Sequence, residues 1–192
     1  MINLKTICFL LILSFIFINC SAAQEKPSLE LPAKTNESSD RVNPDTKKFE
    51  SNAGNFSINI SQLPTQIRNL EPDKGRDPGK QLLWQFEKTV YTVLYSAVDK
   101  NNLSHAFDEM NSGVLKGIGR QGGQLISEKE ISFGKYPGKE IRWIAADGVT
   151  VIGRNYLVND MGYLVTAGFV DGKSEKEALE VLDSFKLLTE KK

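Results

Sequence analysis

The chain is poor in the residues that build metal centres and disulfides. It has two cysteines, Cys8 and Cys20, and none follows Cys20, while His105 is its single histidine. Because thiolates and imidazoles are the ligands of such centres, a metal site of nitrogen and sulfur ligands cannot be assembled after residue 20. No disulfide can form there either, so we expect the region beyond Cys20 to be stabilised by core packing alone.

An excess of charge of either sign is also absent. Lysine and arginine together number 24, as do aspartate and glutamate, so the formal net charge is zero. The short basic groups, such as Lys47-Lys48, do not extend into the basic stripe that phosphate binding requires. The charge pattern therefore argues against a nucleic-acid partner.

The sequence also lacks a hydrophobic run long enough to cross a membrane, for which about 20 apolar residues are needed. Its longest run extends from Ile7 to Ile18 and follows one basic residue, Lys5. A basic residue followed by a short apolar segment is typical of a secretory signal. We therefore predict an export signal over residues 1–23.

Two ways of processing this signal remain open. The small residues Ser21-Ala22-Ala23 would allow cleavage near Ala23, which releases a soluble secreted protein. Alternatively, Phe17-Ile18-Asn19-Cys20 resembles the lipobox of bacterial lipoproteins, in which the cysteine thiol receives a diacylglyceryl group. Phe17 and Asn19 depart from the usual lipobox, which has leucine and a small residue at these positions. The second alternative predicts lipidation of Cys20 and a membrane tether, in the periplasm or on the cell surface.

Residues 21–46 form a polar zone between this signal and the rest of the chain. They are rich in charged and hydroxyl side chains and contain Pro27, Pro32 and Pro44. Such a segment cannot bury enough apolar surface to offset the entropy of ordering it. We expect a flexible tether with a root-mean-square reach on the order of 25–30 Å.

The remaining residues, 47–190, are sufficient for one domain. Turn-forming residues, such as Tyr136-Pro137-Gly138 and Asp147-Gly148, separate segments of alternating polarity. The short connections favour antiparallel neighbours over a parallel doubly wound sheet. Strands are predicted over residues 49–51, 56–60, 81–86, 89–98, 124–133, 139–146, 149–158 and 162–170.

Two segments have the periodicity of amphipathic helices. In the first, apolar residues recur in steps of three and four. The second opens with a capping box formed by Ser174 and Glu177. Together with the strands they predict an α+β fold, a mainly antiparallel sheet packed with two amphipathic helices. The predicted buried stripes are Leu103, Phe107, Met110, Val114, Leu115 and Ile118 in the first helix, and Ala178, Val181, Leu182 and Phe185 in the second.

The order of these elements resembles the Mog1/PsbP-like α/β/α superfamily over roughly residues 48–188. The segment Tyr136-Pro137-Gly138-Lys139-Glu140 and the closing Leu182-Asp183-Ser184-Phe185-Lys186-Leu187 carry the resemblance. It implies an αβα sandwich and a binding or accessory role at a membrane or complex. It also implies a small exported bacterial protein or lipoprotein, and it brings no shared catalytic residues.

The patterns that could carry catalysis are weak. Gly117-Ile118-Gly119-Arg120-Gln121-Gly122 reads G-x-G-x-x-G, but a helix precedes it and a strand follows, the reverse of a dinucleotide site. His105 has no accompanying G-x-S-x-G elbow, and Asp99 opens a segment without the Gly and Glu of a calcium loop. Glu128 and Glu130 share a strand face and could form an acid–base pair, although a solvated face also explains them. No catalytic residue, metal or cofactor is predicted.

Candidates for binding lie in and after the turn-rich loop 71–80, since long loops often carry function. The leading hypothesis is a non-enzymatic, lipid-anchored domain that binds an unknown protein partner or acts as an accessory subunit at the cell envelope. The alternative is a small-ligand carrier or a hydrolase with a site on the aromatic sheet face. The candidate binding residues are Lys74, Arg76, Lys80, Trp84, Tyr91 and Tyr95.

Overall fold

A computed structural model describes residues 40–70 and 79–188 of the chain. The export signal, Cys20 and residues 21–39 of the expected tether lie outside the described residues, as do Lys74 and Arg76. No helix of the described part is long and apolar enough to cross a membrane.

The described residues form strands and helices in the following order. The strands are β1 (Asp40–Asn43), β2 (Lys48–Ser51), β3 (Phe56–Ile58), β4 (Gln66–Asn69), β5 (Lys80–Gln85), β6 (Thr89–Ala97), β7 (Gln124–Phe133), β8 (Tyr136–Ile144), β9 (Thr150–Val158), β10 (Met161–Phe169) and β11 (Lys186–Leu187). The 3₁₀ helix η2 (Lys100–Asn102) and helix α2 (Leu103–Arg120) follow β6, and helix α3 (Gly172–Asp183) follows β10.

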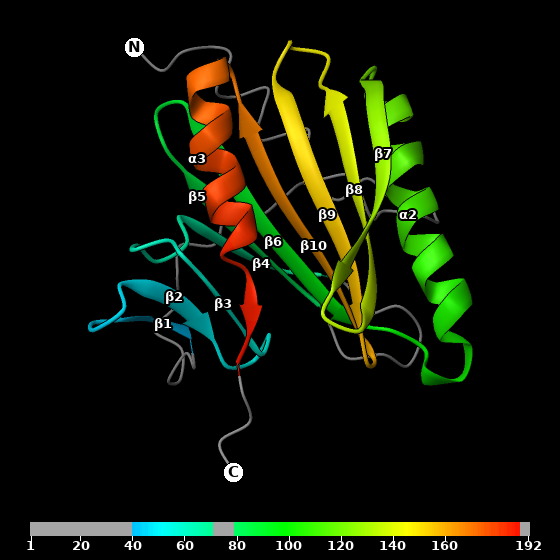
Figure 1. Ribbon diagram of the computed structural model, residues 1–192, viewed down its shortest axis with the longest axis horizontal. Helices are drawn as coiled ribbons and strands as arrows, with labels where there is room; N and C mark the ends of the chain where they lie inside the picture. The colour runs from blue at the N-terminus through cyan, green and yellow to red at the C-terminus, as the bar shows by residue number, and fades with distance from the viewer. Residues whose placement is uncertain (1–39, 71–78, 189–192) are drawn as a thin grey trace.

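The strands form two antiparallel sheets. A seven-stranded sheet has the order β4-β5-β6-β10-β9-β8-β7, and a four-stranded sheet has the order β1-β2-β3-β11. Helix α2 packs on one face of the large sheet, and α3 with the small sheet covers the other (Figure 1). The fold is therefore α+β with an αβα arrangement, as the sequence predicts.

Both faces of the large sheet are buried at its central strands, and this explains why these strands are apolar throughout. In β6, Tyr91, Val93 and Tyr95 point into the core beneath α3 and the small sheet. Leu94 points into the core beneath α2. A strand covered on both faces must be apolar on both, which confirms the interpretation of β6 as a central strand.

The folded part begins earlier than residue 47. Strand β1 starts at Asp40, within the segment expected to be part of the tether, and pairs antiparallel with β2. Arg41 Nη2 lies 3.1 Å from Glu50 Oε2, and Asn43 Nδ2 donates to Glu50 Oε1 at 2.8 Å. Backbone pairing and polar contacts hold this strand, so hydrophobic content did not reveal it.

The turn predicted at Tyr136-Pro137-Gly138 is instead the beginning of β8. The chain reverses before Tyr136, at Gly134, whose positive φ of 59° suits a residue without a side chain. Strand β9 pairs with β8 only from Gly138 onward, so Pro137 has a strand neighbour, β7, on one side only. A proline, which has no N–H to donate, is tolerated at such a position.

The predicted stripe of the second helix is confirmed, since Ala178, Leu182 and Phe185 are buried and Val181 packs against the same core, but the cap of this helix and the buried face of α2 differ from the prediction. Helix α3 begins at Gly172 with Asp171 as its N-cap, so Ser174 is not the cap. In α2, Leu103 is 37% exposed. The buried residues of α2 are Ala106, Asn111, Val114, Gly117 and Ile118.

Candidate binding groove beside helix α3

An open groove of about 610 Å³ lies between α3, the β5–β6 turn and the segment after β3. Its apolar lining comes from Ile60, Phe86, Tyr91 and Val181. The charged side chains of the groove are Glu87, Lys88, Asp171, Lys173, Glu177 and Glu180. An apolar floor with a charged rim can hold a ligand that combines both kinds of group.

Two aromatic rings form part of the groove's floor. Phe86 contacts Tyr91 edge-on, with ring centroids 5.8 Å apart. Tyr91 is only 5% exposed, and burial raises the pKa of its hydroxyl. A hydrogen bond with the Thr89 side chain opposes this rise, and the negative charge of Glu177 adds to it. The carboxylate of Glu177 is therefore close enough to the Tyr91 hydroxyl to disfavour ionisation of that hydroxyl.

The rim of the groove is only partly neutralised within the chain. Lys88 Nζ lies 3.6 Å from Asp171 Oδ2, and Lys176 Nζ lies 3.9 Å from Glu180 Oε1. Glu87 and Glu177 make no ion pair with any residue in the described part of the chain. Both are exposed, so an incoming cation can reach their carboxylates.

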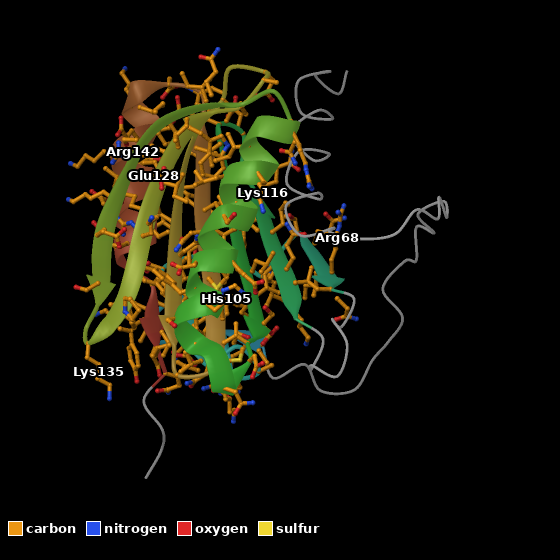
Figure 2. All side chains as sticks on the ribbon, turned by 90° about the vertical axis from the view of Figure 1, so that its right-hand side faces the viewer. Arg68, His105, Lys116, Glu128, Lys135 and Arg142 are labelled. Carbon is orange, nitrogen blue, oxygen red and sulfur yellow. The ribbon has the colours of Figure 1, made fainter. Side chains whose placement is uncertain are left out.

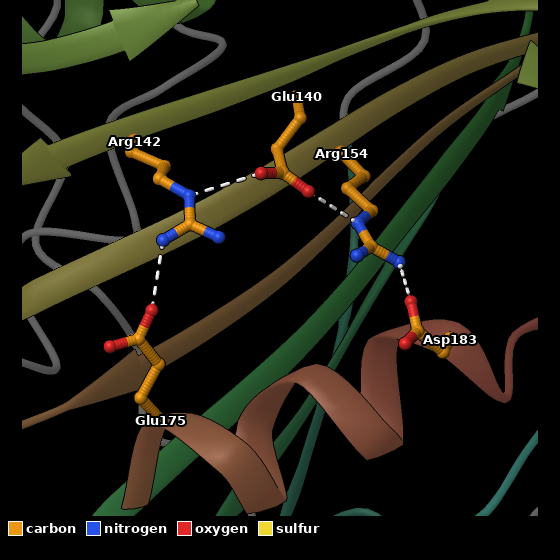
Figure 3. A network of polar contacts seen from close by, with 5 residues as sticks. All are labelled: Glu140, Arg142, Arg154, Glu175 and Asp183. Carbon is orange, nitrogen blue, oxygen red and sulfur yellow. Dashed lines mark hydrogen bonds and ion pairs between the residues drawn. The ribbon is translucent and has the colours of Figure 1, made fainter. Parts of the chain in front are cut away.

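The opposite flank of α3 is held to the sheet by an arginine–carboxylate network (Figure 3). Glu140 accepts from Arg142 Nε at 3.0 Å and from Arg154 Nε at 2.9 Å. Arg142 Nη1 donates to Glu175 at 2.9 Å, and Arg154 Nη1 donates to Asp183 at 2.6 Å. Burial opposes ionisation of Glu140, but the two arginines outweigh it and lower the pKa of its carboxyl. This network docks the helix on β8 and β9.

The structure places the sequence-predicted binding residues in three different settings. Trp84 and Tyr95 are buried core residues, and Trp84 Nε1 donates to the carbonyl of Gln62 at 3.0 Å. Lys80 opens β5 and is half-buried. Tyr91 lines the groove, and it is the one described candidate residue that does so. Trp84 and Tyr95 form no accessible aromatic face, because their rings pack against Phe49 and Phe56.

The weak catalytic patterns also find structural explanations. Glu128 and Glu130 share a face, as expected, and both approach Lys139 Nζ, at 3.5 and 3.3 Å. His105 is exposed on α2 and lies 3.1 Å from Glu109, and Figure 2 views the molecule from this side. Asp99 accepts from the backbone N–H of Asn101 and caps η2. Over residues 40–70 and 79–188, no three His, Cys, Asp or Glu side chains gather as a metal site.

Comparison with known proteins gives structural matches of low sequence identity. No family model matches the chain, and no curated protein matches it. The solution structure of cyanobacterial PsbP (CyanoP) from Synechocystis sp. PCC 6803 is 9% identical, with 83% of this chain and 98% of that chain covered and a TM-score of 0.43. A Pseudomonas aeruginosa protein of unknown function is 11% identical, with 62% and 82% covered and a TM-score of 0.38.

A third match, from Bacteroides thetaiotaomicron, is 16% identical, covers 76% of this chain and 49% of that chain, and has a TM-score of 0.31. These matches concern the fold alone. One of the matched proteins is a PsbP protein, and PsbP gives its name to the superfamily that the sequence resembles. The α+β class is taken from the sheet order and layers described above.

Sequence reasoning missed most of the groove, because its walls come from three separate segments. One signal was available in α3. At about 100° per residue, Glu175 and Asp183 fall on one flank of the apolar stripe, while Glu177 and Glu180 fall on the other. The sequence could therefore have indicated two acidic flanks, but not that only one of them meets arginines.

Proposed function

We propose that this protein is an exported, lipid-anchored domain that binds a protein partner at the cell envelope. The leader that ends at Cys20 supports export and anchoring, and the polar segment after it supports a tether. Binding rests on one observation, the open groove beside α3. Enclosed pockets suit small molecules, whereas an open groove with an apolar floor and a charged rim suits a polypeptide segment.

Photo-crosslinking in intact host cells tests this function. A photoreactive residue in place of Lys173, at the groove, should give a discrete crosslinked protein in the membrane fraction. The same residue in place of Lys116, exposed on α2 on the opposite side of the sheet, is the matched control and should give none (Figure 2). Equal crosslinking from both positions, or none from Lys173, would contradict the proposal.

A further inference from the structure

The carboxylates on the two flanks of α3 differ in their ion pairs. Glu175 and Asp183 are each paired with an arginine of the sheet, at 2.9 and 2.6 Å. On the groove flank, Glu177 has no ion pair among the described residues, and Glu180 has only Lys176, at 3.9 Å. Arginines of the sheet neutralise the carboxylates on one flank, whereas the exposed carboxylates on the other flank are accessible to a cation of a ligand.

The groove as a whole is acidic, although the chain is neutral. Its lining holds four carboxylates and two lysines, so its formal charge is 2 − 4 = −2. Lys88 is occupied by Asp171, which leaves Lys173 as the uncommitted cation of the lining. The acidic groups lie on both walls, Glu87 on the β5–β6 turn and Glu177 on α3. Polyanions such as nucleic acid and acidic lipid headgroups are disfavoured here by like-charge repulsion.

The apolar floor of the groove favours a ligand that also carries an apolar or aromatic group. Phe86 is half-buried, so a side chain in the groove would contact its ring surface, whereas Tyr91, only 5% exposed, supports the Phe86 ring from below. A lysine or arginine over such a ring gains cation–π attraction, and an aliphatic or aromatic side chain gains apolar contact. A small polycation without an apolar group would leave this floor uncovered.

We propose that the groove binds an extended segment of the protein partner in which lysine or arginine residues flank an apolar side chain. The cations meet Glu87, Glu177 and Glu180, and the apolar side chain covers Phe86. This inference deepens the proposed function, since it names the chemistry that the partner presents to the groove.

Peptide binding to the purified full-length protein in mild detergent tests the inference. The probe is a fluorescein-labelled eight-residue peptide in which two arginines flank a leucine-phenylalanine pair within serine and glycine. One comparison peptide has glutamates in place of the arginines, and a second has serines in place of the apolar pair. Fluorescence anisotropy at about 0.05 M salt, where screening is weak, gives the affinities. We expect each comparison peptide to bind about tenfold more weakly than the probe.

Charge-neutralising variants locate the binding site. The double variant E177Q/E180Q should weaken binding of the arginine probe about five- to tenfold, because each exposed rim charge contributes modestly and the variant removes two of them. The variant E175Q removes one charge from the other flank of the same helix and should change affinity less than about twofold. Thermal unfolding of all variants confirms that they are folded, which is expected because Glu177 and Glu180 are exposed.

Three results would overturn the inference: no binding of the arginine probe, equal binding of the glutamate peptide, or equal loss in E175Q and E177Q/E180Q. Spermidine competing as well as the probe would also contradict the apolar requirement. These failures are distinct from failure of the proposed function. A crosslink from Lys173 in cells with no peptide binding in vitro would leave partner binding standing and remove only the basic-segment chemistry.

Discussion

At the residue scale, the most informative group is Glu140, a carboxylate shared by two arginines. Its side chain is 12% exposed and that of Arg154 is 13% exposed, so the pair is largely shielded from solvent. Removing one partner of such a pair leaves the other poorly compensated, and that loss exceeds the net value of the pair. Glu140 therefore matters more to stability than the exposed carboxylates around it.

We predict that Glu140→Gln lowers the free energy of unfolding by about 1.5–3 kcal/mol near neutral pH, because charge-assisted hydrogen bonds from both arginines are weakened. Urea denaturation measures this loss. Glu130→Gln, at a side chain that is 74% exposed, is the control and should cost less than about 1 kcal/mol.

The pH dependence of this loss follows from the pKa of Glu140, which is lowered in the folded protein. A lowered folded pKa gives stability that is present above the unfolded value and is lost as pH falls through the folded value. The difference between wild type and Glu140→Gln should therefore shrink as pH falls below about 4.5. A difference that stays constant down to about pH 3 would contradict the assignment.

A second residue-scale prediction concerns the buried amides of Asn111 and Asn155. Asn155 Nδ2 donates to Asn111 Oδ1 at 2.8 Å and joins α2 to β9. Because Asn155 Oδ1 has no hydrogen-bond partner in the described part of the chain, Asn111→Ala would leave this buried amide without either contact. We expect a cost of about 1–3 kcal/mol in chemical denaturation. Ser112→Ala, at the next position of the helix, is the control; an equally small effect at both positions would show that the amide pair is unimportant.

At the scale of elements, α3 depends on its N-cap. Asp171 Oδ1 accepts from the backbone N–H of Ser174 at 2.9 Å and from its hydroxyl at 2.8 Å. Asp171→Ala should lower stability by about 1 kcal/mol, whereas Asp171→Asn, which keeps a capping oxygen, should cost only a few tenths. Thermal unfolding compares the two variants. If they are equally destabilised, the cap is not the reason for the loss.

The elements were predictable where a single periodicity decides them. Strand β7 and the start of α2 match the sequence expectation, because alternation and a three-four apolar pattern are local signals. The start of β8 was not predictable, since Pro137 signals a turn unless the one-sided pairing is known. The cap of α3 was displaced because Asp171 and Ser174 are both capping residues. The groove was hidden for a different reason, that three distant segments form it.

At the scale of the whole molecule, the two faces of the large sheet differ in what they expose to solvent. The face of α2 covers one core and carries exposed residues such as His105. The side of α3 combines a helix fixed by arginines on one flank with an acidic, aromatic-floored groove on the other. The proposed function assigns anchoring to Cys20 and recognition to the groove, so we expect that each can be removed without the other.

The mass of the mature N-terminus tests the central claim most directly. Protein isolated from the membrane fraction, wild type against Cys20→Ala, is digested and its first peptide weighed. The account predicts that the wild-type peptide begins at Cys20 and carries a diacylglyceryl group, and that the variant lacks this group and leaves the membrane fraction or keeps its leader. A wild-type protein that begins at Gln24 without lipid, or that remains in the cytoplasm with residues 1–19 attached, would contradict it.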